Sequence, residues 1–368
     1  MANQLQKIFS GFSFGSKKED SAIGIDIGAS SVKVVQLRKE NGKALLETYG
    51  AIALGPYAGK EIGRVTNLEA EQLAQATKDV VQASSVTTMN GSVSIPSSSS
   101  IVFILSLPAT LSEGDLATVV PTEARKYIPV PMTDVSLDWY LIPTREEILV
   151  GEKRTTGTTD VLVVALLNST LEKLTSFAEK AEVKDPLYEI EIFSAIRSTF
   201  DREIAPVLLF DLGASKTKLT IVQSGVVRAF HIINRGSHEV TESIARSLQM
   251  SFARAEQLKH DYGLESIAEY PQLGEIIRTA LEPILSEAAS TILSYERTHN
   301  QTMNKIIFIG GGVSLRGFLD HARARFSCDV SLGNPFKKVE APVFLDSILS
   351  TTGPEFAIAL GLALKKLE

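Results

Sequence analysis

One short phrase occurs twice in the chain and constrains its fold more than any other feature. Residues 26–33 read Asp-Ile-Gly-Ala-Ser-Ser-Val-Lys, and residues 211–218 read Asp-Leu-Gly-Ala-Ser-Lys-Thr-Lys, 211 − 26 = 185 positions later. A β-rich run enters each copy and another leaves it, which predicts two β-hairpins with glycine-containing turns. A duplicated hairpin in turn predicts two related lobes that face each other, with one turn from each lobe at the cleft.

The residues of these turns favour an anionic ligand. Glycine tolerates positive φ and lets a ligand approach the backbone, where successive N–H groups bind phosphate and serine hydroxyls add hydrogen bonds. Lys33 supplies a compact positive charge. Asp26 and Asp211 suit Mg²⁺, directly or through water, because this ion prefers oxygen ligands. For one copy a polar hairpin tip is the alternative interpretation, but two facing copies favour the phosphates of a nucleotide.

Composition limits the class of protein. At 368 residues the chain exceeds a usual single domain, and its net charge of −6 argues against nucleic-acid binding. The single cysteine, Cys328, fits a reducing compartment. We find no uninterrupted apolar run of a spanning helix's length and no signal peptide, so we expect a cytoplasmic protein. For residues 1–20 we expect a mobile tail, with a weak interfacial membrane anchor as the alternative.

The periodicity of apolar residues predicts an α/β fold in several segments. A polar stretch at 96–100 precedes a block of different character, predicted as βαββα from strand 101–107, helix 113–127, strands 135–142 and 159–167, and helix 169–181. A helix at 188–197 is expected to lead back to the second hairpin. The expected segments are a tail at 1–20, the first part of lobe 1 at 21–100, an insert at 101–182, a return helix at 183–204, lobe 2 at 205–345 and a closing helix at 346–368.

Two further features belong to the second half of the chain. A strand at 305–309 runs into three glycines at 310–312 before a helix at 318–326, where a flat ligand can lie on bare backbone. The closing helix carries Ala357 and Gly361 four positions apart. Small residues at that spacing predict close packing against the first lobe.

In this order, the features across residues 23–368 resemble the actin, Hsp70 and sugar-kinase superfamily, which implies a ribonuclease H-like duplicated ATPase fold with two lobes. The position of the insert is similar to that in the FtsA-type branch of bacterial actin-like proteins. Within that branch, four phrases resemble the PilM family, the cytoplasmic actin-like proteins of type IV pilus machines. These phrases lie at 123–131, 138–140, 189–197 and 255–259.

The resemblance implies a site for ATP or ADP with Mg²⁺ between the lobes. It places Asp26 and Asp211 beside the Mg²⁺ ion and Glu191 near the attacking water, although Glu191 could equally face solvent. Glu256 and Lys259 would contact ribose and adenine, with a surface ion pair as the alternative. The other residues implied to bind nucleotide lie in three turns: Gly28, Ala29, Ser30, Ser31 and Lys33; Gly213, Ala214, Ser215, Lys216 and Thr217; and Gly311, Gly312 and Leu315.

The resemblance also implies a partner. In PilM relatives, a groove where the insert meets the first lobe receives the cytoplasmic N-terminal peptide of a membrane protein, PilN. An apolar peptide with basic residues would need an apolar slot with carboxylates at its mouth. The alternative is that the apolar candidates are core and the acidic ones a solvated face. The candidates are Tyr127, Ile128 and Val130, with Glu123, Asp134 and Asp138.

Three classes of function remain open. A small-molecule kinase needs a general base beside a substrate hydroxyl, and we find no distinctive substrate loop. A filament-forming FtsA-like protein is the second class. The third is an adaptor in which nucleotide closes the lobes and the surface recruits a partner, which requires only differential affinity for two lobe arrangements. We expect an adaptor, held at the inner face of the cytoplasmic membrane by its partners and contacting the pilus assembly ATPase, with slow hydrolysis at most and self-association left open.

Overall fold

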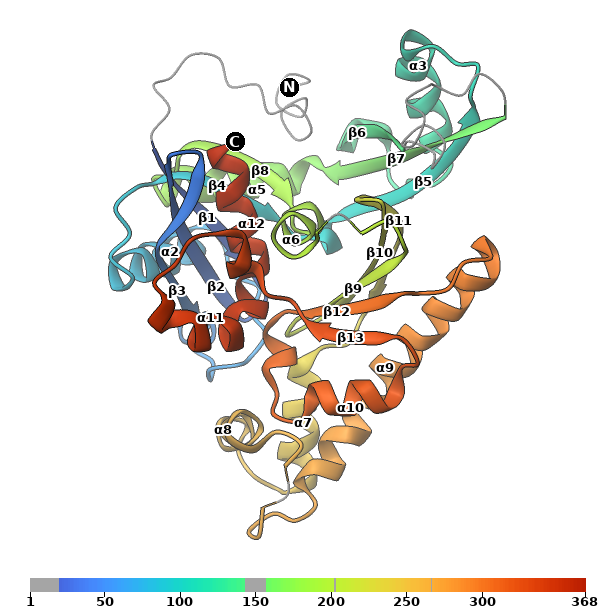
Figure 1. Cartoon of the computed structure of the whole chain (residues 1–368). Helices are drawn as coiled ribbons and strands as arrows, with labels where there is room; N and C mark the ends of the chain where they lie inside the picture. Colours follow the sequence, from blue (N-terminus) through green and yellow to red (C-terminus); the bar gives the residue numbers. More distant parts are fainter. Residues whose placement is uncertain (1–19, 143–156, 202, 266) are drawn as a thin grey trace.

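The structure is a computed structural model that describes residues 20–142, 157–201, 203–265 and 267–368. Two five-stranded sheets of identical strand order form its two lobes (Figure 1). In each sheet three antiparallel strands are followed by two parallel ones. The predicted duplication is therefore confirmed, and with it the α/β actin-like fold class.

The sheet strands follow one another in the same spatial sequence in both lobes. In lobe 1 they are β3 (Lys43–Ala53), β2 (Ser31–Glu40), β1 (Ser21–Ile27), β4 (Asn90–Ile95) and β8 (Lys184–Ile190). In lobe 2 they are β11 (Val226–Ile233), β10 (Thr217–Gln223), β9 (Val207–Leu212), β12 (Lys305–Ile309) and β13 (Asp329–Leu332).

Alternating residues of the lobe 1 sheet build a separate core on each face. Ile23 and Ile25 of β1 pack with α2 (Ala70–Ala83) and α5 (Asn168–Lys180). Ala22, on the opposite face, packs with α12 (Ala357–Leu367). The approach of α12 is close, because a Cβ on Gly361 would lie 1.9 Å from the backbone oxygen of Ser194 in α6 (Glu191–Thr199). The predicted small-residue packing of the closing helix on lobe 1 is thus observed.

The stretch Val343–Leu367 has the length and mean hydropathy of a membrane-spanning helix, whereas the sequence was expected to hold no apolar run of that length. It comprises a short 3₁₀ turn, α11 (Asp346–Thr352), a second 3₁₀ turn and α12. Most of its apolar window is buried in the fold. The apolar composition of α12 is accounted for by its central position between β1 and α6.

The insert is a three-stranded sheet, with α3 (Glu113–Ala124) on one of its faces. It projects from between the lobes at the upper right of Figure 1. Its other face joins the core of lobe 1. The predicted helix α5 also packs on α2 in that core, so it covers lobe 1 rather than the insert sheet. The strands of the insert lie in the order β5 (Ser100–Pro108), β7 (Thr158–Leu167) and β6 (Val135–Ile142).

One face of the lobe 2 sheet forms a large core with four helices, and its other face packs against residues of α6 and α12. The four helices of the large core are α7 (Ser237–Ser247), α8 (Phe252–Tyr262), α9 (Leu273–His299) and α10 (Phe318–Arg325).

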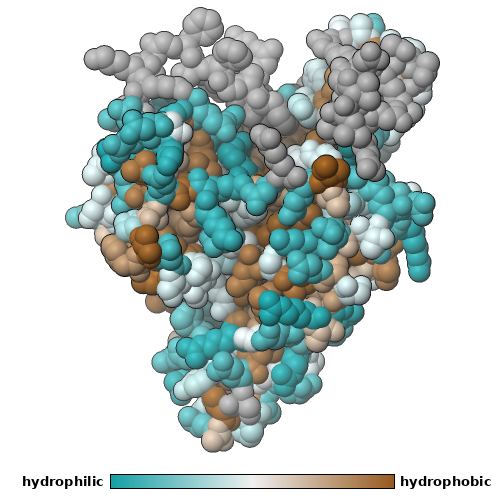
Figure 2. Space-filling model, in the orientation of Figure 1, coloured by the Kyte–Doolittle hydropathy of each residue, from teal (hydrophilic) through white to brown (hydrophobic). Residues whose placement is uncertain are grey.

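On the surface seen in Figure 2, hydrophilic side chains cover much of both lobes, and apolar side chains gather in smaller groups.

The helix predicted at 188–197 is wrong in its first turn. Residues 188–190 end strand β8, which pairs parallel to β4 with Ile190 opposite Ile95. The helix α6 begins only at Glu191. The sequence Glu-Ile-Glu-Ile fits the alternation of a strand as well as one face of a helix. Residues 188–190 form a strand because their backbone pairs with β4. This boundary matters because it places Glu191 where β8 ends and α6 begins.

Candidate functional site

A cavity of about 690 Å³ lies between the two lobes. This volume is in the range of small-molecule sites in proteins. Nearly all residues predicted to bind nucleotide or metal line it, although they come from positions up to 289 apart, 315 − 26. They are Asp26, Gly28, Ala29, Ser30, Ser31, Lys33, Glu191, Asp211, Gly213, Ala214, Ser215, Lys216, Glu256, Lys259, Gly311, Gly312 and Leu315.

The two hairpin turns have the same internal geometry. Gly28 N donates to Ser31 O at 2.9 Å, and Gly213 N donates to Lys216 O at 3.1 Å. Neither glycine has the positive φ that the sequence argument assumed. Glycine is needed for space instead, since a Cβ would lie 3.0 Å from Ser31 O in the first turn and 2.8 Å from Lys216 O in the second. The turns are therefore tight, and their backbone is open to the cavity.

Lys218 is a site residue that the sequence analysis missed. Its Nζ lies 3.0 Å from Asp211 Oδ2 and 2.9 Å from Glu191 Oε2. Burial alone would lower the pKa of Lys218, but the two carboxylates raise it above its ordinary value, so this lysine stays protonated. The signal was present in the repeated phrase, because Lys218 occupies the position of Lys33: each lysine lies opposite its aspartate across the hairpin.

Asp26 is the buried carboxyl group of the first turn, with 4% of its surface exposed. Burial raises its pKa to about 6, opposed by the charge of Lys33 and reinforced by that of Glu191. A cation entering the cavity would therefore favour its ionised form. Among the described residues no three His, Cys, Asp or Glu side chains gather as a metal site. A Mg²⁺ ion here would need phosphate oxygens and waters for most of its ligands.

Glu191 does not face solvent, which was the alternative interpretation. It is 5% exposed, at the first position of α6. Both of its oxygens have partners: Oε1 accepts from Ser97 N at 2.7 Å, and Oε2 pairs with Lys218. A carboxylate engaged in this way is held at the cavity wall by one hydrogen bond and one ion pair.

Glu256 and Lys259 form a pair inside the cavity rather than on the surface. Lys259 Nζ lies 2.7 Å from Glu256 Oε2 and donates to Thr241 Oγ1 at 2.8 Å. Thr241 in turn donates to Glu256 Oε2 at 2.5 Å. Burial lowers the pKa of Lys259, against the influence of Glu256. This closed triangle presents polar groups of α8 to a ligand in the cavity.

The third turn, residues 310–312, differs from the two hairpin turns because one of its glycines, Gly311, has open space where a Cβ would lie. Gly310 has φ of 89°, and a Cβ on Gly312 would lie 2.4 Å from Leu212 Cγ, so both serve the packing of the turn. A Cβ on Gly311 would meet no atom closer than 4.0 Å.

Thr217 was also predicted to bind nucleotide, but it does not line the cavity. It is fully buried, and its hydroxyl donates to Arg235 O at 2.8 Å.

The residues predicted for the partner groove divide between the two faces of the insert. Ile128 and Val130 belong to the core beneath α3. Tyr127 is 55% exposed and stacks on Phe103, with ring centroids 5.0 Å apart. Glu123 pairs with Lys126 at 2.7 Å, and Asp134 is exposed. None of these five lines the cavity between the lobes.

Asp138 lies on the other face, which joins the core of lobe 1. It is opposite Val164, a member of that core. Its Oδ1 accepts from Trp139 N at 2.9 Å, whereas its buried Oδ2 has no hydrogen-bond partner among the described residues. Burial raises the pKa of Asp138 to about 6. Its strand, β6, is an edge strand of the insert sheet.

Two lobes of one topology, each presenting an Asp-containing turn to a shared cavity, define the fold of the actin-like ATPases. The particular family follows from a direct match. Residues 24–367 fit the family model of the type IV pilus assembly protein PilM, and the chain belongs to this family.

Individual proteins are similar to this chain at low sequence identity, and the solved structures among them share its fold. The cell division protein FtsA of Neisseria meningitidis serogroup B is 22% identical over 382 residues, covering 94% of this chain and 90% of that protein. A structure described as the PilM-PilN type IV pilus biogenesis complex has a TM-score of 0.78 at 23% identity, covering 96% of this chain and 100% of that one. MreB5 of Spiroplasma citri, bound to ADP, has a TM-score of 0.50 at 12% identity, covering 94% and 95%.

Proposed function

We propose that this PilM-family protein is a nucleotide-dependent adaptor of type IV pilus assembly. The observation that carries the proposal is the convergence of both Asp-containing turns on one cavity of about 690 Å³. The cavity also holds two cationic side chains, Lys33 and Lys216, that have no ion pair among the described residues. Cations beside open backbone N–H groups suit the phosphates of ATP or ADP.

The proposed pose follows from the chemistry of the lining. The phosphates lie between the turns at 28–31 and 213–216, with Asp26 and Asp211 beside a hydrated Mg²⁺ ion that offsets phosphate charge. The ribose reaches the Glu256 and Lys259 pair, and the adenine lies over Gly311, where the backbone is bare. MreB5, a protein of the same fold, is bound to ADP, which supports a nucleotide as the ligand of this chain.

Calorimetric titration with Mg-ATP tests this site. We expect saturable binding to the wild type, and at least tenfold weaker binding to Lys216→Met, since one direct phosphate contact is lost. Asp320→Asn is the control, because the partner of Asp320 among the described residues is Arg323 on the outside of α10. Absence of heat or of saturation with the wild type at millimolar nucleotide would refute the site.

The partner in this proposal is the cytoplasmic N-terminal peptide of a PilN-like membrane protein. A solved structure of the same fold is described as a PilM-PilN complex, which supports a PilN-like partner. Among the described residues no strand lies beside the outer edge of β6, so its backbone groups there can pair with an extended peptide. The buried, unpartnered Oδ2 of Asp138 offers a partner for a basic side chain of that peptide. The adaptor would thus be held at the cytoplasmic membrane through its partner and reach the assembly ATPase from there.

A peptide copied from the N-terminus of the host's PilN tests the docking site. Deleting residues 101–182 would not be a clean test, because it removes α5 from the core of lobe 1. Point reversals are better: we expect Asp138→Lys to abolish peptide binding and Asp134→Lys to weaken it slightly at low salt, where exposed charges are least screened. Equal loss in both variants would place the docking site elsewhere.

A further inference from the structure

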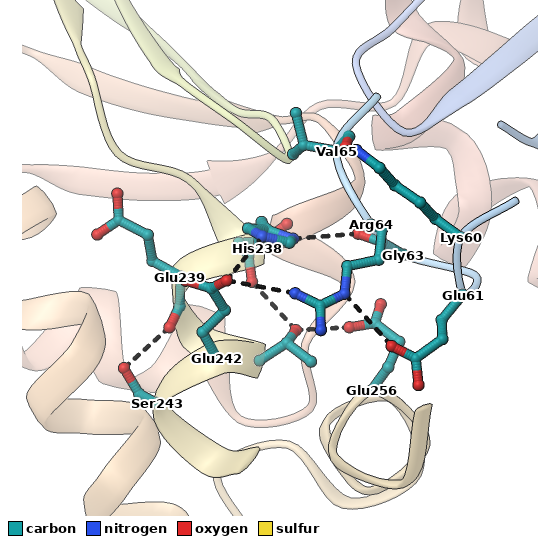
Figure 3. A network of polar contacts seen from close by, with 12 residues as sticks. Lys60, Glu61, Gly63, Arg64, Val65, His238, Glu239, Glu242, Ser243 and Glu256 are labelled. Carbon is teal, nitrogen blue, oxygen red and sulfur yellow. Dashed lines mark hydrogen bonds and ion pairs between the residues drawn. The ribbon is translucent and has the colours of Figure 1, made fainter. Parts of the chain in front are cut away.

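A short segment of lobe 1 crosses beside the cavity and contacts lobe 2 (Figure 3). This strap, residues 55–66, follows strand β3, and hydrogen bonds at its last residue and at the residue before its first join it to the hairpin turn at residues 28–31. At one end Leu54 N donates to Ser30 O at 2.8 Å. At the other end Thr66 N donates to Ala29 O at 2.9 Å. The ends of the strap therefore move with the turn that faces the cavity.

Arg64 makes the main side-chain contacts between the strap and lobe 2. Its Nη1 lies 3.3 Å from Glu242 Oε1 on α7, and its Cζ lies 3.8 Å from the ring centroid of Phe252 on α8. Its Nε also pairs with Glu61 of the strap at 3.3 Å. One guanidinium group thus joins two helices of lobe 2 to lobe 1, through an ion pair and a cation–π contact.

Two more contacts accompany Arg64. Glu61 Oε1 accepts from Ala253 N at 3.2 Å, where the first turn of α8 leaves its N–H groups free and favours a carboxylate. The carbonyl oxygen of Gly63 lies 3.4 Å from His238 Nδ1 on α7. Each of these contacts is weak alone, but all of them must break if the strap is to leave lobe 2.

The strap also supports a residue of the cavity wall. Gly63 has φ of 85°, and a Cβ there would lie 2.7 Å from Glu256 Cδ. Glu256 is the carboxylate that forms the triangle with Lys259 and Thr241. The strap backbone at Gly63 therefore lies directly against the side chain of Glu256, which lines the cavity on the lobe 2 side.

From this arrangement we propose that the strap is a clasp that holds the lobes closed over a bound nucleotide, with Arg64 as a positioning residue that acts through the strap. The inference rests on the proposed nucleotide site. A ligand between the lobes leaves only when they separate, and separation requires the strap to release α7 and α8. Breaking the contacts of Arg64 should therefore speed release more than it slows entry, since entry occurs from the open state.

Stopped-flow release of a fluorescent ATP analogue, chased with excess ATP, tests the clasp in the full-length protein. We expect Arg64→Ala to release the analogue about tenfold faster, with an association rate within about twofold of the wild type. Arg254→Ala is the matched control on α8, where the arginine side chain, within the described part of the chain, donates to Gln257 of its own helix. Equal release rates in all three proteins would overturn the proposal.

A second measurement does not depend on nucleotide binding. Spin labels at Lys78→Cys on α2 and Arg323→Cys on α10, in a Cys328→Ser background, report the distance between the lobes. We expect Arg64→Ala to broaden this distribution toward longer distances, and an unchanged distribution would refute the clasp. If the wild type fails to bind the analogue, the proposed nucleotide site fails instead, and the distance measurement alone decides the clasp.

Discussion

Lys218 Nζ lies 2.9 Å from Glu191 Oε2, and this ion pair joins strand β10 of lobe 2 to helix α6 of lobe 1. The same ammonium group neutralises Asp211 at 3.0 Å. The residue expected to activate water is thus bound to an internal cation. This arrangement favours a site that binds nucleotide and responds to it over one built for rapid turnover.

The first prediction concerns the stability of this buried triad. Lys218→Met should lower the free energy of unfolding by about 3 to 5 kcal/mol, because it leaves two buried carboxylates without their cation. Urea unfolding measures the change. Lys216→Met is the control: this lysine has no ion pair among the described residues, and its loss should cost less than about 1 kcal/mol. A similar effect in both variants would mean that the triad is not the source of the loss.

The second prediction separates a catalytic from a structural Glu191. A general base contributes about 10² to 10⁴ to a rate. Because Glu191 is bound to Lys218, we expect ATP hydrolysis to be slow and Glu191→Gln to change it by less than about tenfold. The measurement is phosphate release at saturating Mg-ATP. A fall of a hundredfold or more would identify Glu191 as the base after all.

The third prediction is a pH dependence that arises from Asp138. Its pKa is about 6 in the folded protein, above the ordinary value of 3.8, so folding favours the protonated form. The wild type therefore loses stability as pH rises from about 4 through about 6, and Asp138→Asn lacks this contribution, while Asp26, whose pKa is also raised to about 6, contributes equally to both proteins. At pH 7.5 we expect the variant to be more stable by about 1 kcal/mol, a value reduced for the solvent that reaches this half-buried group.

Urea unfolding at pH 5 and pH 7.5 checks this dependence. Asp134→Asn, with an exposed side chain, is the matched control and should follow the wild type at both values. A constant difference between Asp138→Asn and the wild type across this range would contradict the assignment.

The fourth prediction tests the close packing of the closing helix. Gly361→Ala places a Cβ 1.9 Å from the backbone oxygen of Ser194, which cannot move without shifting α6. We expect a loss of about 3 kcal/mol in the free energy of unfolding. Gly114→Ala in α3 is the control, because its Cβ would lie 3.8 Å from the nearest side-chain atom. Unchanged stability of Gly361→Ala would show that α12 can shift freely.

The repeated phrase was sufficient to predict the two lobes and most of the cavity, because a hairpin turn is determined by residues close together in sequence. Lys218 could have been identified in the same way, as the counterpart of Lys33. Its pairing with Glu191 could not, since that contact spans 218 − 191 = 27 positions and two lobes. The strand at 188–190 was missed because the local sequence fits a strand and a helix equally well. Only its pairing with β4, which is distant in sequence, makes it a strand.

The partner surface was the least predictable part. Apolar residues near proline, such as Ile128 and Val130, look alike in sequence whether they pack beneath a helix or line a groove. The alternation of β6 separates Asp138 from Trp139, but only the packed sheet reveals which of the two faces meets lobe 1. The strap of residues 55–66 carried no motif, because its role depends on the helices that it reaches.

The most direct test of the nucleotide-dependent adaptor is the affinity of the full-length protein for the PilN-derived peptide, measured by fluorescence anisotropy with and without saturating Mg-ATP. If nucleotide closes the lobes and the peptide distinguishes the two arrangements, the dissociation constant should change by at least about fivefold, and the peptide should alter nucleotide affinity by the same factor. Equal peptide affinity in the presence and absence of Mg-ATP, with both ligands bound, would contradict the account.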